Sequence, residues 1–220
     1  MGFRSSALTV GLVLAGAWLT PGPSRAAPSA ASAAADCCGV ISPAGDRLLS
    51  LLDGLQVETH WLAGDAIDWR TGNPKPGTRG LTSHCSAFAA AVAQRFGAYL
   101  LRPPEHGQVL LANAQAAWLA GDAGRAAGWS PLDGAVAAQS AANAGALVVI
   151  SYRSANPRTP GHIAVVRPAR QTLGEVTRSG PMITQAGQQN FNATRAETGF
   201  HAHRAAWPGG VAYYAFTPPR

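Results

Sequence analysis

The chain has 220 residues, enough for one ordinary domain with its own hydrophobic core and few for two. Hydrophobic residues make up 47% of the chain and charged residues 13%, which excludes a charge-rich disordered protein. Neither the heptads of a coiled coil nor the repeated long apolar segments of a polytopic membrane protein are present. The net charge is +6, but the basic residues, all but one of them arginines, are scattered singly, so we expect no nucleic-acid partner.

The N-terminal residues have the pattern of a secretory signal peptide. Arg4 precedes an apolar run over residues 7–19, and Pro and Gly end that run before the small-residue stretch Ser24–Ala26. The run is shorter than the roughly 20 residues that span a bilayer, so we expect cleavage rather than stable membrane insertion. The expectation is a signal peptide over 1–26, a flexible Ala/Ser/Pro segment over 27–40, and a periplasmic or extracellular location.

Three cysteines are an odd number for an exported chain, in which thiols normally pair. Cys37 and Cys38 are adjacent, whereas Cys85 stands alone. The simplest interpretation is that Cys37 and Cys38 pair with each other or with a partner chain. Cys85 would then remain a free thiol.

Residues 41–220 are expected to form one domain, helical in its first half. Helices are expected over residues 46–55, 82–99, 107–120 and 133–143, with a short strand over 57–61 and a surface loop over 68–80. Asp46 is the expected N-cap of the first helix, and Thr82 or Ser83 that of the second, which puts Cys85 in its first turn. Gly145 is expected to end the last helix in the left-handed conformation.

The second half of the chain is rich in β-branched and aromatic residues. Strands are expected over residues 146–152, 162–166, 181–186 and 211–216, separated by Gly/Pro turns. Helices followed by antiparallel strands predict an α+β fold in which the helices pack on one face of a small antiparallel sheet.

Cys85 is the candidate nucleophile, because a helix N-terminus stabilises a thiolate through its free N–H groups and its dipole. His162 is the candidate base, since it follows Pro160-Gly161 at the start of a strand. A third polar residue must orient the imidazole. If strands 162–166 and 181–186 pair around a turn near 174–180, position 187 lies opposite His162 and Gln185 shares its face. Asn190 is the alternative to Gln185.

The tetrahedral intermediate needs hydrogen-bond donors for its oxyanion. The backbone N–H of Cys85 can supply one, with a side chain from residues 82–84, among them His84, as the second. Trp69, on the loop that leads to Cys85, is a candidate substrate contact. His201 and His203, with His84 and His106, raise a zinc hypothesis, but their spacing matches no common zinc pattern, so we expect neither a metal nor another cofactor.

The residues that carry this chemistry resemble a known superfamily. The segment Thr82–Phe88, the strand over 146–150 and the run Pro160–Val166 look like those of papain-like amidases of the CHAP and NlpC/P60 type, over roughly residues 80–192. In that superfamily a cysteine begins a helix, a histidine begins a strand, and a polar residue on the next strand orients it. The resemblance implies the same fold and a cysteine amidase or endopeptidase.

Those enzymes commonly cleave amide bonds in bacterial peptidoglycan, so the implied substrate is cell-wall peptide. Two alternatives remain open at this point: a cysteine protease acting on proteins, and a non-catalytic secreted module that uses the same fold to bind cell wall or a partner. The sequence identifies neither the bond that is cleaved nor an inhibitor protein.

Overall fold

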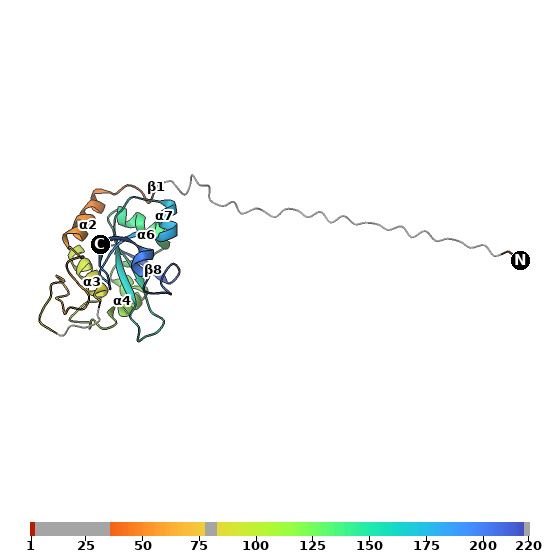
Figure 1. Ribbon diagram of the computed structural model, residues 1–220. Coiled ribbons are helices and arrows are strands. Elements are labelled where there is room, and N and C mark those ends of the chain that lie inside the picture. Colours follow the sequence, from red (N-terminus) through yellow and green to blue (C-terminus); the bar gives the residue numbers. More distant parts are fainter. Residues whose placement is uncertain (3–35, 78–82, 218–220) are drawn as a thin grey trace.

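The structure is a computed structural model that describes residues 1–2, 36–77 and 83–217 (Figure 1). The expected signal peptide lies outside the described residues except for its first two, and so do residues 27–35 of the expected flexible segment. Within the described ranges, no helix has both the length and the apolar character needed to span a membrane.

Six antiparallel strands form the central sheet, in the order β2-β8-β3-β4-β6-β7. Their bounds are β2 Trp129–Leu132, β3 Leu147–Tyr152, β4 His162–Val166, β6 Met182–Gln185, β7 Phe191–Arg195 and β8 Val211–Phe216. The four strands expected from sequence are confirmed with their ends within one residue, and β2 and β7 add an edge on each side. The antiparallel sheet and the mixed α+β class are therefore as expected.

Helices cover both faces of this sheet, which corrects the expectation of a single covered face (Figure 1). The helices are α2 Pro43–Gly54, α3 Cys85–Phe96, α4 Leu111–Ala120, α5 Asp122–Ala126, α6 Gly134–Asn143, α7 Leu173–Ser179 and α8 Ala196–Phe200. The first three pack against one face, and α6 and α8 pack against the other.

Strand β3 shows why both faces must be covered. Leu147 and Val149 pack with α2 and α3, whereas Val148 and Ile150 point to the opposite face and pack with α6. All four are fully buried. Successive side chains of a strand point to opposite faces, so an unbroken apolar run requires a cover on each side.

The helix starts differ from those expected. Helix α2 begins at Pro43, because the Ser42 hydroxyl caps it by accepting from the Gly45 N–H at 3.1 Å, and Asp46 therefore lies in the first turn. Helix α3 begins at Cys85 itself, its N-cap is His84, and no side chain caps it. Helix α4 begins four residues late, after Leu110 with a left-handed φ of 56°. Helix α6 and the left-handed Gly145, at φ 96°, agree with expectation.

The strand expected over 57–61 is a series of turns. Gln56 and Trp61 have positive φ angles of 50° and 53°, which no strand accommodates. The Trp61 ring is nevertheless fully buried, and its indole N–H donates to the Trp69 carbonyl at 3.0 Å. The apolar residues that resembled a strand thus anchor a loop to the core.

Cys37 and Cys38 form a disulfide with each other, and Cys85 is a free, buried thiol. This agrees with the simplest interpretation of the three cysteines. The disulfide lies at the end of β1 (Asp36–Cys37), which pairs with β5 (Gln171–Thr172). The Asn143 side-chain amide donates to the carbonyls of Cys38 and Gly39. Residues 36–40 therefore belong to the folded unit rather than to a flexible segment.

Candidate active site

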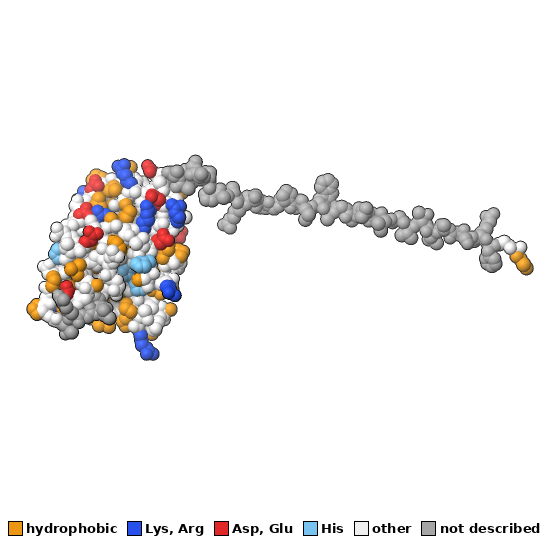
Figure 2. Space-filling model, viewed as in Figure 1, with side chains coloured by type: hydrophobic (Ala, Val, Ile, Leu, Met, Phe, Trp, Pro, Cys, Tyr) orange, Lys and Arg blue, Asp and Glu red, His pale blue; other side chains and the backbone are white. Residues whose placement is uncertain are grey.

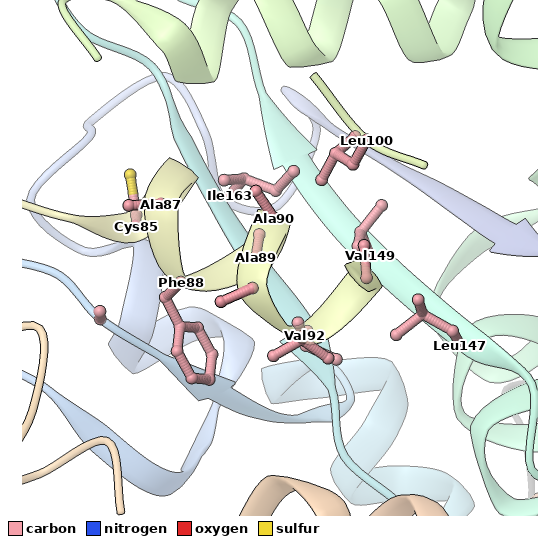
Figure 3. Close-up of a cluster of buried hydrophobic side chains, with 14 of the residues drawn as sticks. Cys85, Ala87, Phe88, Ala89, Ala90, Val92, Leu100, Leu147, Val149 and Ile163 are labelled. Atoms are coloured by element: carbon pink, nitrogen blue, oxygen red, sulfur yellow. The ribbon is translucent and has the colours of Figure 1, made fainter. Parts of the chain in front are cut away.

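Cys85 is the first residue of α3 and lies where the helix meets the central sheet. In Figure 3 its sulfur and the Phe88 ring point to opposite sides of the helix, and Ala90 lies near Ile163 of β4. Phe88 and Ala90 are fully buried and fix the helix against the sheet. Since no side chain caps α3, its first backbone N–H groups remain available to an anion.

The thiol itself is 5% exposed. Burial raises the pKa of Cys85, while the backbone N–H groups of Ile163, Ser86 and Cys85 itself act in the opposite direction by favouring the thiolate. Ile163 directly follows His162, so the interaction of its N–H with the thiol brings Cys85 to the start of β4. Cys85 and His162, which are 77 positions apart in sequence (162 − 85 = 77), thus both lie near the start of β4, an inner strand of the sheet.

His162 is hydrogen-bonded to Gln185, with 2.9 Å between the imidazole Nε2 and the amide Oε1. The orientation of the amide follows from its other bond, in which Gln185 Nε2 donates to the Gln189 carbonyl at 3.2 Å. A carbonyl only accepts, so Oε1 must face His162, and Nε2 of the imidazole must be the donor. In the neutral ring, Nδ1 then carries the free lone pair that a base requires.

Burial lowers the pKa of His162, and the hydrogen bond that its Nε2–H donates to Gln185 raises the pKa by a smaller amount. The two side chains are 4% and 3% exposed, so little water competes for this bond. The pKa of the thiol is thus raised and that of the imidazole lowered, and both shifts favour a neutral pair over a thiolate and an imidazolium.

The register between β4 and β6 explains how Gln185 reaches His162. Val165 pairs with Thr184 and Val166 with Ile183, so the same register puts residue 187 opposite His162, as expected from the sequence. A Cβ on Gly187 would lie 3.6 Å from Cε1 of the imidazole. The connection is not the simple hairpin turn expected near 174–180, because β5 and α7 occupy it.

Asn190, the alternative to Gln185, lies near this site but has different partners. Its Nδ2 donates to the carbonyls of Val57 at 2.7 Å and His60 at 2.8 Å, and its Oδ1 accepts from the Gly187 N–H at 2.9 Å. These bonds satisfy the backbone of the 57–61 turns. The geometry gives the orienting position to Gln185 and a supporting position to Asn190.

His84 is poorly suited to donate to an oxyanion. Its Nε2 lies 2.8 Å from the Asp65 carbonyl, which can only accept, so the single N–H of the neutral ring is already used. Burial lowers the pKa of His84, which disfavours the second proton that a further donor would need. Of the other expected donors, Thr82 lies outside the described residues. The backbone N–H of Cys85 and the half-buried Ser83 stay the expected donors.

Trp69 is a buried core residue rather than a surface residue. Its side chain is 6% exposed, and the guanidinium groups of Arg70 and Arg102 lie over its ring at 4.9 and 5.9 Å. These cation–π contacts occupy the ring that was expected to touch a substrate.

Two amides near the site had no signal in the sequence. Gln115 of α4 donates from Nε2 to the carbonyls of Ser86 at 3.0 Å and Leu101 at 2.9 Å, and thereby fixes the first turn of α3. Asn113 packs against Gly161, where any side chain would overlap the Tyr152 carbonyl. Close packing therefore requires a glycine before His162, whereas the Pro-Gly-His sequence indicated only a turn at this position.

His203 was considered only as a zinc ligand, but in the structure its ring stacks on that of His162. No group of three or more His, Cys, Asp or Glu side chains within the described ranges could hold a metal ion. The structure thus joins the imidazole of His162 to the amide of Gln185 and puts the thiol of Cys85 beside the backbone of the next residue, Ile163.

No protein-family model matches the chain, and a search of curated proteins also finds no match.

Proposed function

We propose that this protein is an exported cysteine hydrolase of the papain-like, NlpC/P60–CHAP type, acting as an amidase or endopeptidase on the peptides of the cell wall. The observation that carries the proposal is the buried His162–Gln185 hydrogen bond next to the helix-opening thiol of Cys85. An imidazole fixed in one tautomer beside a thiol has the geometry that activates a nucleophile.

In the proposed reaction the Cys85 sulfur attacks the carbonyl carbon of an amide, and Nδ1 of His162 takes the thiol proton. The negative charge that develops on the carbonyl oxygen is stabilised by the backbone N–H of Cys85 at the positive end of α3. The imidazolium then protonates the leaving amine as the C–N bond breaks. Water, deprotonated by His162, hydrolyses the thioester and restores the thiol.

The charge of the chain gives only weak support for a cell-wall substrate. The chain is basic overall, as suits an anionic wall polymer, but on the face shown in Figure 2 basic and acidic side chains lie among one another. The described part of that face therefore carries no continuous basic patch.

The decisive experiment incubates the purified protein with purified peptidoglycan and identifies released fragments by mass spectrometry. The Cys85→Ala variant is the inactive comparison, and Gln188→Ala, at an exposed amide, is the matched control that should behave as the parent. Fragments from the parent and control but not from Cys85→Ala support the proposal, and their masses identify the bond. Cleavage of denatured protein instead of peptidoglycan would indicate a protease.

The second candidate is a non-catalytic secreted binding module, and the low exposure of the Cys85 thiol favours it. Alkylation by iodoacetamide as a function of pH separates the two. A thiol that passes its proton to His162 reacts wherever the imidazole is neutral, and this range extends below pH 6.5 because burial lowers the pKa of His162. A protected thiol without such a base reacts only near and above pH 9, because burial raises its pKa.

A further inference from the structure

The imidazole of His162 is enclosed by one short segment that begins in α8 and continues into the following turn. Gly199 packs against the amide of Gln185, since a Cβ at this position would lie 2.5 Å from Oε1. The rings of Phe200 and His162 form a T-shaped contact, with ring centroids 4.7 Å apart and an interplanar angle of 73°. His203 lies face to face with His162, with centroids 5.3 Å apart and an angle of 20°.

The backbone holds Phe200 and His203 in this arrangement. The His203 N–H donates to the Phe200 carbonyl at 2.9 Å, and the Ala206 N–H donates to the His203 carbonyl at 2.8 Å. Phe200 is fully buried in the core on this face of the sheet, so it anchors the turn. Both rings therefore approach His162 from one rigid turn.

His203 also contacts Tyr152, whose ring centroid lies 5.6 Å away. Tyr152 pairs directly with His162 across β3 and β4, so the two rings stand side by side on one face of the sheet. His203 lies over both of them. An imidazole has two rotatable bonds, and a single hydrogen bond at Nε2 still permits rotation about the axis of that bond. A flat ring stacked on its face removes this freedom.

We infer that His203 is a positioning residue, which holds the His162 ring in the plane where its Nε2–H meets Oε1 of Gln185. The inference rests on the proposed function, since it assigns to His203 a part in preparing the base. His203 acts as a neutral flat ring in this role. Burial, together with the neighbouring His162 and His201, lowers the pKa of His203 to about 4, so the ring carries no charge at neutral pH.

This role predicts how substitutions differ. His203→Ala removes the stacked ring and is expected to lower kcat about 2- to 12-fold with little change in KM, as the value of an aromatic pair implies. His203→Phe restores a flat ring without a titratable group and is expected to restore kcat to within about 2-fold of the parent. The matched control is His201→Ala, which removes an exposed imidazole that has no ring contact with His162.

The groups that face His203 and can titrate are His162, Tyr152 and His201, so each variant is measured across pH 5–8 as well as at pH 7. A hydrolase that loses activity equally in His203→Ala and His203→Phe would overturn the inference, as would one that keeps full activity in both. If the parent has no hydrolase activity, the proposed function fails, and the inference is then judged by ¹⁵N NMR of the His162 ring. The Nε2–H signal should broaden in His203→Ala and sharpen again in His203→Phe, and an unchanged signal in both would refute the stacking role. Thermal unfolding confirms that each variant is folded.

Discussion

The hydrogen bond between His162 and Gln185 gives the sharpest test of the site. Replacing Gln185 by Ala removes the only acceptor that the structure provides for Nε2–H of His162 within the described part of the chain. The donor is left in a buried position, and an unsatisfied buried donor costs about 1–3 kcal/mol. If the loss is expressed in the transition state, kcat/KM falls about 5- to 150-fold.

The same substitution changes the pKa of the base in a defined direction. The bond that His162 donates to Gln185 raises the pKa of His162, so removal of this bond is expected to lower that pKa further below 6.5 and weaken the base. Gln185→Glu acts in the opposite direction, because a carboxylate beside the imidazole stabilises the imidazolium and raises its pKa. The acid limb of the activity profile should therefore move down in pH for Gln185→Ala and up for Gln185→Glu.

The assay combines peptidoglycan hydrolysis with the rate of Cys85 alkylation from pH 5 to 9, so that one readout needs no substrate. Gln188→Ala, an exposed neighbour of the same residue type, is the control for loss of an amide. If Gln185→Ala kept the parental rates and pH profile while remaining folded, the hydrogen bond would not orient the base, and the proposed roles of Gln185 and His162 would be wrong.

Three further predictions follow from the same contacts. Gly199→Ala should lower the melting temperature and the activity, because a Cβ 2.5 Å from Gln185 Oε1 overpacks the site at a cost of about 1–3 kcal/mol. Alanine in place of glycine normally stabilises a helix. A higher melting temperature of the variant in differential scanning calorimetry would therefore contradict this prediction. The pH profile of kcat/KM for the parent should form a broad plateau. Its acid limb should lie below pH 6.5, where His162 is protonated, and its alkaline limb above pH 9, where Cys85 ionises. A narrow pH optimum would contradict the neutral pair. The free energy of unfolding, measured by urea titration, should fall as pH drops from 6.5 towards 4. The reason is that His162 and His203 take up protons at a higher pH in the unfolded chain than in the folded one. A free energy of unfolding that stays constant over this range would contradict their lowered pKa values.

Much of the candidate site is local and could be predicted. A cysteine that opens a helix and a glycine followed by a strand-opening histidine are visible within short segments, because caps, turns and strands depend on neighbouring residues. The partner of His162 could also be predicted, since antiparallel strands fix their pairing by simple counting. Val165 opposite Thr184 leads directly to Gln185 on the same face as His162.

Other expectations failed because the deciding contacts lie far apart in sequence. The 57–61 segment has strand-like composition, but the Asn190 side chain, 133 residues after Val57, satisfies its carbonyls and holds it in turns. Propensity describes the chain near a residue, and it cannot report a hydrogen bond from another part of the fold.

The sequence by itself determined the α+β class and the four main strands, and it indicated Cys85 and His162 as the candidate thiol and imidazole, with Gln185 or Asn190 as the third side chain. Only the tertiary structure decided that helices cover both faces of the sheet and that His203 stacks on His162. The physical reason is that local patterns fix backbone conformation and the face on which a side chain lies. The packing of rings and amides from distant segments is fixed only when the core closes around them.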